Sequence, residues 1–302
     1  MTEDSGQGPF SSEDTARTLV RACAEAGIDS RDAVLLRLGE NAIYRLSAVP
    51  VVARIARTTD YLPDVQTEVA AARWLEAVGF PAVRLAGPAD QPLVVDGRPV
   101  TFWEVVSDRE EYGTIGELAR LLRWLHALEP PSSLVLPELR PFRRVERRIE
   151  RAALAEEDRV FLRDRLADLR EQYDRLEFAL PPGPIHGDAN IGNILRSRDG
   201  NAVLIDLDGF ATGPREWDLV QTAMYFEHLG WHTAEEYETF VTAYGFDLTT
   251  WPGYPPLRSI RELIMVSWLA QNASEDPDVA AEVHKRINDL RSGNGRRDWA
   301  PF

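Results

Sequence analysis

The segment Ile185-His186-Gly187-Asp188-Ala189-Asn190-Ile191-Gly192-Asn193, together with Leu204-Ile205-Asp206-Leu207-Asp208 further along, is the most informative part of this chain. It sets Asp188, Asn193 and Asp206 at the spacing H-x-D-x-x-x-x-N followed by a later aspartate, which is typical of magnesium-dependent phosphoryl transfer. Asp188 is placed to take the proton of an acceptor hydroxyl. Asn193 and Asp206 offer a neutral and a charged oxygen to a magnesium ion, which favours hard oxygen ligands.

The residues around these two segments predict a β-hairpin that brings them together. Residues 181–184 (Pro-Pro-Gly-Pro) exclude a helix, so the chain enters the first segment extended. Short apolar runs then flank residues 197–201, a polar turn that contains Asp-Gly. The hairpin would return Asp206 to the neighbourhood of Asn193. Asp and Asn also fill loops and cap helices, but the complete ordered set around a hairpin favours the site.

Asp208 follows Asp206 by two residues. If the strand continues through both, their side chains share one face, because side chains alternate along a strand. Asp208 would then contact the metal or orient a water molecule beside it.

Length, composition and charge describe a soluble, two-lobed protein. A chain of 302 residues with 44% hydrophobic content is long for a single core. No apolar run approaches the length of a membrane span, and the N-terminus lacks the features of a signal peptide. The single cysteine, Cys23, excludes an intrachain disulfide and fits a reducing cytoplasm. A net charge of −15 argues against a nucleic-acid partner, since phosphate binding requires basic surface.

The apolar pattern changes near residue 107 and predicts an α+β, bilobal chain. We expect a disordered tail over residues 1–11, a nucleotide-binding lobe over 12–106, and a helical lobe over 107–302 that holds the hairpin and the acceptor pocket. The expected strands cover residues 34–38, 43–46, 51–57, 92–95 and 99–106. The expected helices cover residues 12–26, 65–78, 118–128, 161–173, 218–228, 234–244, 257–272 and 277–290.

With these motifs the chain resembles the aminoglycoside phosphotransferase (APH) family, a branch of the protein-kinase-like fold that includes small-molecule kinases for choline, homoserine and sugars. The resemblance runs from about residue 34 to 290. It is most specific over residues 186–218, where the family carries H-G-D-x-x-x-x-N and an I-D-x-D-like element. It implies a small antiparallel sheet in the N-terminal lobe and a mostly helical C-terminal lobe.

The resemblance also implies a role for each motif residue. Asp188 would be the catalytic base, and Asn193 and Asp206 would be the magnesium ligands. Residues 213–219 match a further family segment, in which Asp218 would brace the catalytic loop by accepting backbone hydrogen bonds. His186 would be a scaffold residue and not a proton shuttle.

The kinase template pairs a lysine on the third strand with a glutamate on the next helix. Here Arg54 stands at the lysine position and Glu68 lies in the next helix, while the only lysine of the chain is Lys285. A guanidinium is a planar fork and not a point charge, yet it can bind a phosphate and a carboxylate together. The resemblance implies that some branches tolerate the change. The alternative is an exposed strand arginine and a solvated helix glutamate.

Further residues are candidates for nucleotide binding. Gly39 and Asn41 belong to the expected loop over the phosphates, although one glycine equally fits an ordinary turn. The base would lie against the last predicted strand of the first lobe, with backbone groups of Glu104 and Val106 as partners. Trp103 suits the core as well as the base. ATP and GTP fit these residues equally.

The region after residue 218 is expected to form the acceptor pocket. Acidic and aromatic side chains together suit a polar, aminated ligand with several hydroxyls. The main candidates are Tyr225, Glu227, Trp231 and Trp268. Glutamates at 235, 236 and 238 extend this set, or alternatively form the solvated start of a helix at its positive dipole end.

We therefore predict an enzyme that moves the γ-phosphoryl group of ATP or GTP, with Mg²⁺, to a hydroxyl of a small molecule, most simply an antibiotic, aminoglycoside-like or other. A metabolic kinase of a sugar, amino sugar or amino alcohol is the first alternative. A catalytically silent kinase-like binding module is the second; the missing lysine favours it and the intact motif opposes it. Protein kinase activity is disfavoured, because no D-F-G or A-P-E segment follows. Nothing in the sequence indicates an oligomeric state.

Overall fold

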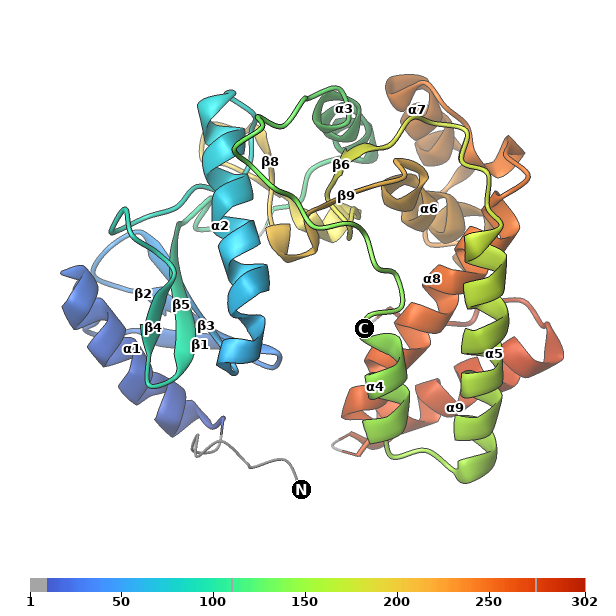
Figure 1. Cartoon of the computed structure of the whole chain (residues 1–302), viewed down its shortest axis with the longest axis horizontal. Helices are drawn as coiled ribbons and strands as arrows, with labels where there is room; N and C mark the ends of the chain where they lie inside the picture. The colour runs from blue at the N-terminus through green and yellow to red at the C-terminus, as the bar shows by residue number, and fades with distance from the viewer. Residues whose placement is uncertain (1–9, 110, 275, 302) are drawn as a thin grey trace. The chain divides into compact units, whose positions relative to one another are not determined.

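The computed structural model describes residues 10–109, 111–274 and 276–301, which form two compact units (Figure 1). The first unit comprises Met1–Thr114, Glu129–Pro137 and Ile191–Phe210, and the second comprises the remaining segments. Of the expected tail over residues 1–11, residues 1–9 lie outside the described part of the chain, and Ser11 is the N-cap of the first helix.

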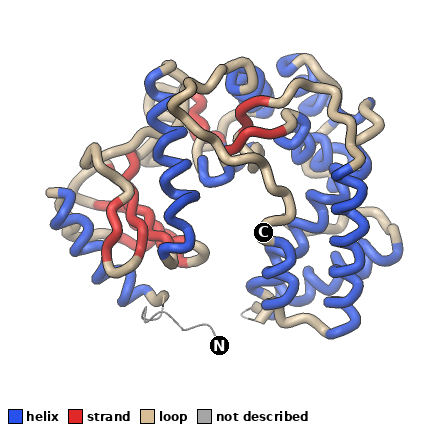
Figure 2. Tube along the Cα trace, in the orientation of Figure 1, coloured by secondary structure: helices blue, strands red, loops and turns tan. Residues whose placement is uncertain are grey.

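The first unit is built on a five-stranded antiparallel sheet with the strand order β1-β2-β3-β5-β4. Its strands are drawn in red in Figure 2. In β3 the residues alternate between the buried core and the opposite face, and Arg54 lies on the face opposite Ala53 and Ile55. The five expected strands are confirmed to within two residues at each end. They are β1 (Val34–Leu38), β2 (Asn41–Leu46), β3 (Val51–Ala56), β4 (Leu93–Val95) and β5 (Arg98–Glu104).

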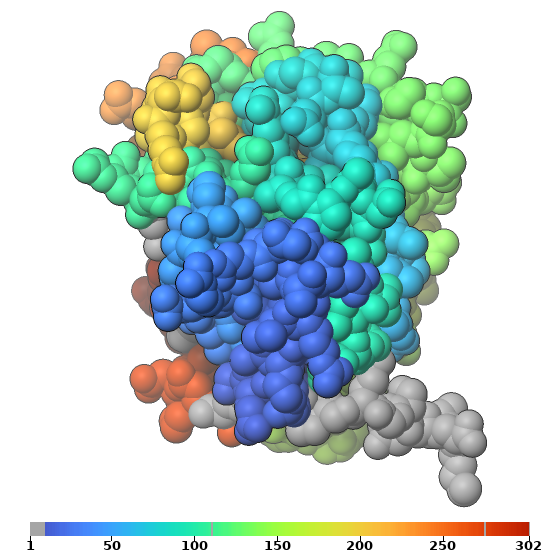
Figure 3. All heavy atoms as spheres, turned by 90° about the vertical axis from the view of Figure 1, so that its left-hand side faces the viewer, coloured from blue at the N-terminus to red at the C-terminus, as the bar shows by residue number. Residues whose placement is uncertain are grey.

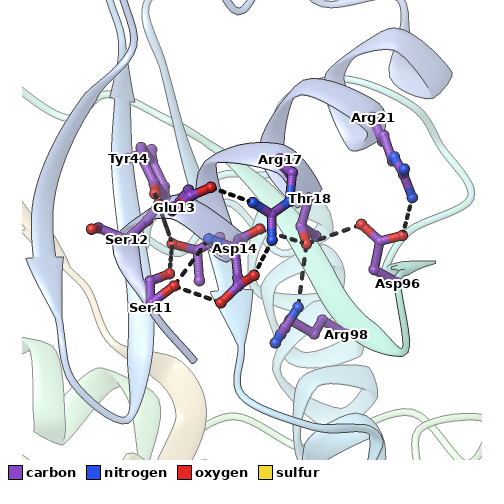
Figure 4. Close-up of polar contacts among 11 residues, drawn as sticks. Ser11, Ser12, Glu13, Asp14, Arg17, Thr18, Arg21, Tyr44, Asp96 and Arg98 are labelled. Atoms are coloured by element: carbon purple, nitrogen blue, oxygen red, sulfur yellow. Dashed lines mark hydrogen bonds and ion pairs between the residues drawn. The ribbon is translucent and has the colours of Figure 1, made fainter. Parts of the chain in front are cut away.

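Helix α1 (Ser12–Ala26) packs its apolar side against the sheet and forms part of the face turned to the viewer in Figure 3. Ser11 caps it by accepting a hydrogen bond from the N–H of Asp14 at 3.2 Å. Polar contacts tie the same helix to the β4–β5 turn (Figure 4). The hydroxyl of Thr18 donates to Asp96 at 3.2 Å, and Arg21 forms an ion pair with the same carboxylate.

Cys23 lies in this core and is fully buried (0% exposed). Burial raises the pKa of its thiol to about 11, with a smaller contribution from the charge of Asp29. Because the thiolate is the reactive form, we expect the native protein to resist a water-soluble thiol reagent at mildly alkaline pH. Labelling should accelerate only in denaturant, as the first unit opens. Rapid labelling without denaturant, measured against a Cys23→Ser variant as blank, would contradict this burial.

Helix α2 (Leu62–Ala77) follows β3 through a short 3₁₀ turn (Thr59–Tyr61) and has a proline in its first turn. It packs against the turn Leu207–Gly209 of the hairpin, and Trp74 meets the ring of Phe210 edge-on at 6.1 Å between centroids. The hairpin is therefore part of the first unit.

The expected hairpin is confirmed. Its strands are β7 (Ile194–Arg196) and β8 (Ala202–Leu204), preceded by the 3₁₀ turn Ile191–Asn193. Leu204 also pairs with the segment after α2, because its N–H donates to Pro81 at 2.9 Å and its carbonyl accepts from Val83 at 2.8 Å. The boundary expected at residue 106 placed this hairpin with the helices, whereas its contacts group it with the sheet.

The second unit is mostly helical (Figure 2). The strands β6 (Gly183–Ile185) and β9 (Ala211–Gly213) form a two-stranded ladder beside its helices. The helix α4 was not predicted from the sequence. Within the described residues no helix has the length and apolar content that a membrane span requires. The helices are α3 (Ile115–Leu125), α4 (Val145–Arg151), α5 (Glu156–Asp174), α6 (Glu216–Met224) with the π turn Tyr225–Leu229, α7 (Ala234–Tyr244), α8 (Tyr254–Leu269) and α9 (Pro277–Ser292), with 3₁₀ turns at Leu248–Thr250 and Ala270–Asn272.

Candidate functional site

One cluster of candidate site residues lies in the first unit, around Arg54 of β3. Arg54 Nη1 donates to Glu68 Oε1 of α2 at 2.7 Å and lies 3.5 Å from Asp206 Oδ1. Its Nη2 donates to Asp208 Oδ2 at 3.3 Å. One guanidinium thus meets three carboxylates from two segments that are far apart in the sequence. The alternative of an exposed arginine and a solvated glutamate does not describe this arrangement.

Asn41, at the start of β2, also reaches Arg54. With its amide turned so that the oxygen faces the guanidinium, Asn41 Oδ1 accepts from Arg54 Nε at 3.0 Å and from Nη2 at 2.8 Å. The sequence suggested a phosphate contact for Asn41 and did not suggest this one. Gly39 has no steric reason within the chain to be glycine, since a Cβ there would meet only Arg37 Nε at 3.8 Å.

Burial and charge both act on this cluster. Glu68 is 2% exposed, and burial raises its pKa to about 7; Arg54 opposes the rise, and the charges of Asp208 and Asp206 add to it. For Arg54, burial acts to lower the pKa, but the three carboxylates outweigh it, so its pKa is raised and the guanidinium stays charged. The fully ionised cluster has one positive and three negative charges, an excess that one divalent cation would balance.

Asp206 follows β8 in the left-handed conformation, with φ 60° and ψ 62°. Few residues other than glycine adopt this conformation, which costs roughly 1–2 kcal/mol. The strand does not continue through Asp206 and Asp208, because β8 ends at Leu204 and residues 207–209 form a 3₁₀ turn. Asp208 reaches Arg54 through that turn and not through strand alternation. The carbonyl of Asn193 accepts from the N–H of Ile205 at 2.9 Å, which keeps Asn193 beside the residue that precedes Asp206.

These residues fit a magnesium ion. Asn193, Asp206 and Asp208 carry hard oxygen donors, and the excess negative charge of the Arg54 cluster favours a divalent cation. No group of three His, Cys, Asp or Glu side chains with metal-binding geometry occurs in the described residues. The fit therefore rests on two carboxylates and an amide, with nucleotide phosphates and water as the usual remaining ligands of magnesium. The three ligand assignments stay predictions.

The backbone positions expected to bind the base lie at the end of β5. The N–H of Glu104 donates to the carbonyl of Arg84 at 2.8 Å, so a base contact at Glu104 would use its carbonyl. Val106 follows just beyond the strand. Trp103 is buried, and its indole N–H donates to Thr101 at 2.9 Å, so it belongs to the core.

A separate cluster of candidate residues lies in the second unit, around Asp188, whose side chain is 48% exposed. Arg261 Nη2 of α8 donates to Asp188 Oδ1 at 2.7 Å. The N–H of Asp188 donates to His186 Nδ1 at 3.3 Å, and Asn190 Nδ2 donates to the Asp188 carbonyl at 3.0 Å. Gly187 has a φ of 86°, a conformation that requires glycine at this point of the loop.

Asp218 of α6 is fully buried beneath this loop. Its carboxylate accepts from the N–H of His186 at 2.7 Å and from the N–H of Gly187 at 2.8 Å. His126 Nε2 lies 3.0 Å from the same carboxylate, and its Nδ1 lies 2.8 Å from the hydroxyl of Tyr244. Burial acts to raise the pKa of Asp218, but the hydrogen bonds and the charges of His126 and His186 outweigh it and lower the pKa. Sequence reasoning did not find His126.

Arg261 was not predicted either. It is only 6% exposed, and besides Asp188 it donates to the amide oxygen of Gln221 on α6. Its guanidinium lies over the ring of Trp217, 5.0 Å from the centroid. The indole N–H of Trp217 in turn donates to the carbonyl of Gly187 at 2.8 Å. Arg261 therefore joins α8 to the loop that carries Asp188.

The structure brings together two of the four residues expected in the acceptor pocket. The rings of Tyr225 and Trp231 lie 4.8 Å apart. Burial raises the pKa of Tyr225, and the charge of Asp188 adds to this rise. Glu227 instead forms an ion pair with Arg258 at 3.5 Å. The indole of Trp268, half-buried on α8, forms no hydrogen bond within the described residues.

Of the two interpretations of the glutamates at the start of α7, the structure supports the solvated start of a helix. Thr233 accepts a hydrogen bond from the N–H of Glu236, and the Glu236 carboxylate accepts from the N–H of Thr233 at 2.7 Å. This reciprocal pair is a capping box, and it accounts for an acidic residue at that position.

A model of the phosphotransferase enzyme family (APH) matches residues 31–259 of this chain. The chain therefore belongs to this family and is a small-molecule kinase, a phosphotransferase with a hydroxyl group as acceptor. No match was found among the curated proteins.

Solved structures share the fold over nearly the whole chain. They include the amicoumacin kinase hAmiN in complex with AMP-PNP, Ca²⁺ and Ami, with 14% identity over 95% of this chain and 98% of that chain and a TM-score of 0.71. A microcompartment-associated aminopropanol kinase has 18% identity over 91% and 95% of the two chains and a TM-score of 0.63. The choline kinase LicA from Streptococcus pneumoniae has 16% identity over 93% and 100% and a TM-score of 0.62. At these identities the likeness shows the fold alone, which is protein-kinase-like.

Proposed function

We propose that this enzyme transfers the γ-phosphoryl group of ATP or GTP to a hydroxyl of an antibiotic and thereby confers resistance. The observation that carries the nucleotide assignment is the contact of Arg54 with Glu68 at 2.7 Å, made by a guanidinium that also meets Asp206 and Asp208. A silent binding module would have no need for this charge arrangement beside an intact motif. The arrangement supports Arg54 as the replacement for the usual lysine.

In the proposed reaction, an oxygen of the acceptor hydroxyl bonds to the γ-phosphorus. The bond from that phosphorus to the bridging β-oxygen breaks, and its electron pair leaves with the nucleoside diphosphate. The hydroxyl proton passes to the carboxylate of Asp188. Because such transition states are loose, we expect Asp188 to contribute through positioning as well as proton removal.

The remaining residues bind and orient the reactants. Arg54, fixed by Glu68, would bind phosphate oxygens through its planar fork. Asn193, Asp206 and Asp208 would hold Mg²⁺, which when bound neutralises the negative charge of the phosphates. Gly39 would leave room for the phosphates. The backbone of Glu104 and Val106 would take the base.

The loop of Asp188 is held from below by Asp218. Its hydrogen bonds to the N–H groups of His186 and Gly187 support a bracing role for Asp218 and a scaffold role for His186. The single buried thiol of Cys23 fits a reducing compartment, and the cytoplasm stays the proposed location.

A metabolic kinase of an amino alcohol, sugar or amino sugar is the second candidate. The similar folds include kinases named for aminopropanol and for choline as well as kinases named for amicoumacin and spectinomycin. Two observations favour an acceptor with few amines: Glu227 forms an ion pair with Arg258, and Glu236 serves as a helix cap. A polycationic aminoglycoside would need acidic groups that are not used in this way.

The proposed function is tested by nucleotide turnover with a panel of acceptors. Purified protein with Mg²⁺ and either ATP or GTP would be offered kanamycin, spectinomycin, amicoumacin, choline, 1-amino-2-propanol and glucosamine. We expect diphosphate release with one of the antibiotics, and a product heavier than the acceptor by one phosphoryl group. Turnover with choline, 1-amino-2-propanol or glucosamine, and with none of the antibiotics, would favour the metabolic kinase. No nucleotide turnover with any acceptor, with or without Mg²⁺, would favour the binding module.

A further inference from the structure

Arg261 is a buried charge placed against the half-exposed carboxylate of Asp188. A guanidinium that is 6% exposed is costly unless it is paired and hydrogen-bonded. The partners of Arg261 are Asp188 Oδ1 at 2.7 Å, the amide oxygen of Gln221, and the face of Trp217 at 5.0 Å. Two of these partners, Gln221 and Trp217, belong to α6. The helices therefore hold the guanidinium independently of its contact with the loop that carries Asp188.

We propose that Arg261 is a positioning residue for Asp188, which holds one carboxylate oxygen and so aims the other at the acceptor hydroxyl. The inference rests on the proposed role of Asp188 as the base. An aspartate χ2 torsion has a broad energy well, so the contacts of the carboxylate decide its orientation. A charge-assisted hydrogen bond from a fixed planar group narrows that orientation. Misplacement of a reacting group by about 1 Å can cost roughly a hundredfold in rate.

A purely structural ion pair is the competing interpretation, and the chain offers a matched control for it. Arg286 of α9 is 2% exposed and donates from Nε to Glu282 at 2.8 Å. Its guanidinium lies over the ring of Trp299 at 4.8 Å. Burial, carboxylate partner and tryptophan face are thus the same as for Arg261, but the carboxylate belongs to Glu282 and not to Asp188.

The test compares Arg261→Met, Arg261→Lys and Arg286→Met with the unchanged protein. Assays would use MgATP and the acceptor with the highest turnover in the panel above, or ATP hydrolysis with no added acceptor. We expect Arg261→Met to lower kcat roughly 10- to 100-fold with little change in the KM for ATP. Arg261→Lys should recover part of the loss, because an ammonium retains one donor to Asp188. Arg286→Met should lower the thermal midpoint about as much as Arg261→Met does, while its kcat changes less than about threefold.

A double-mutant cycle decides whether Arg261 acts through Asp188. In an Asp188→Asn background, Arg261→Met should lower kcat by less than about twofold further, since the group that it positions is already lost. Full additivity would overturn the proposal and assign Arg261 an independent role. An equal loss of kcat in Arg286→Met would overturn it in favour of a structural role. If Asp188→Asn alone leaves kcat intact, the proposed role of Asp188 as base fails, and this inference fails with it; if Asp188→Asn is inactive and both Arg261 variants are fully active, only the present inference fails.

Discussion

Asp188→Asn is expected to lower turnover by about a hundredfold or more while MgATP still binds. Asparagine keeps the shape of the side chain, and its amide can still face Arg261. It cannot accept a proton from the acceptor hydroxyl, and a general base typically contributes 10²–10⁴-fold. The nucleotide contacts proposed here come from Arg54 and the hairpin, which the substitution leaves intact. The KM for ATP and its binding constant by calorimetry should therefore change little.

Asp199→Asn is the matched control for this loss. It makes the same change of carboxylate to amide in the exposed β7–β8 turn, and we expect its turnover to equal that of the unchanged protein. Single-turnover measurements separate the chemical step from product release. Undiminished turnover in Asp188→Asn would remove Asp188 from its role as base. A loss of ATP binding that accounts for the whole effect would instead place Asp188 among the nucleotide contacts.

The parts of the fold that have local signals were predictable. Helix α7 begins and ends at the expected residues because Thr233 and Glu236 form a capping box at its start and Gly245 adopts a left-handed conformation at its end. In β3, the alternation of side chains places Arg54 on the face opposite the core. Its contact with Glu68 of the next helix could therefore be predicted from the strand's two-residue repeat and the order of the two elements in the chain.

Where local signals are absent or misleading, prediction failed. Helix α4 reads Val-Glu-Arg-Arg-Ile-Glu-Arg, with only Val145 and Ile149 to mark an apolar side, so its period was not apparent. Strand β8 ends at Leu204 and does not reach Asp208, since Asp206 takes a left-handed conformation. An aspartate tolerates that conformation, but an aspartate in the sequence does not predict it.

The partners of buried charges were the hardest to foresee. Arg261 and Glu262 stand in an apolar run of α8, which signals that each must find a partner. The partner of Arg261 lies 73 residues away and that of His126 lies 92 residues away. No spacing rule connects residues at such separations. The motif located the candidate site, and the packing of α6, α8 and α3 supplied the residues that hold it.

Arg54→Met is expected to lower the free energy of unfolding by about 3 kcal/mol, because it leaves a buried carboxylate without its counter-charge. Glu68 is 2% exposed, and Asp206 and Asp208 add negative charge beside it. The thermal midpoint by calorimetry measures the loss. Arg73→Met, an exposed arginine on the same helix as Glu68, should shift the midpoint only slightly and serves as the control.

The loss in Arg54→Met should grow with pH. Burial raises the pKa of Glu68 to about 7 even with Arg54 present, against an ordinary value of 4.5. The folded state thus binds this proton more readily than the unfolded state, so the contribution of Glu68 to stability falls as the pH rises from about 4.5 through about 7. Without Arg54 the folded carboxylate is harder still to ionise, and the gap between variant and unchanged protein should widen above neutral pH. A gap independent of pH would show that Glu68 is not the group affected.

A second substitution separates the stability effect from the chemistry. In Arg54→Met/Glu68→Gln the buried charge is gone, and replacing a buried ion pair by neutral groups is often close to neutral in stability, so most of the thermal midpoint should return. Turnover should not return, because the double variant still lacks a guanidinium to bind the phosphates. The turnover of Arg54→Lys should be intermediate, since an ammonium cannot span Glu68 and Asp208 as a fork. Recovery of turnover together with stability would mean that Arg54 only ties β3 to α2. The nucleotide would then depend on the hairpin residues alone.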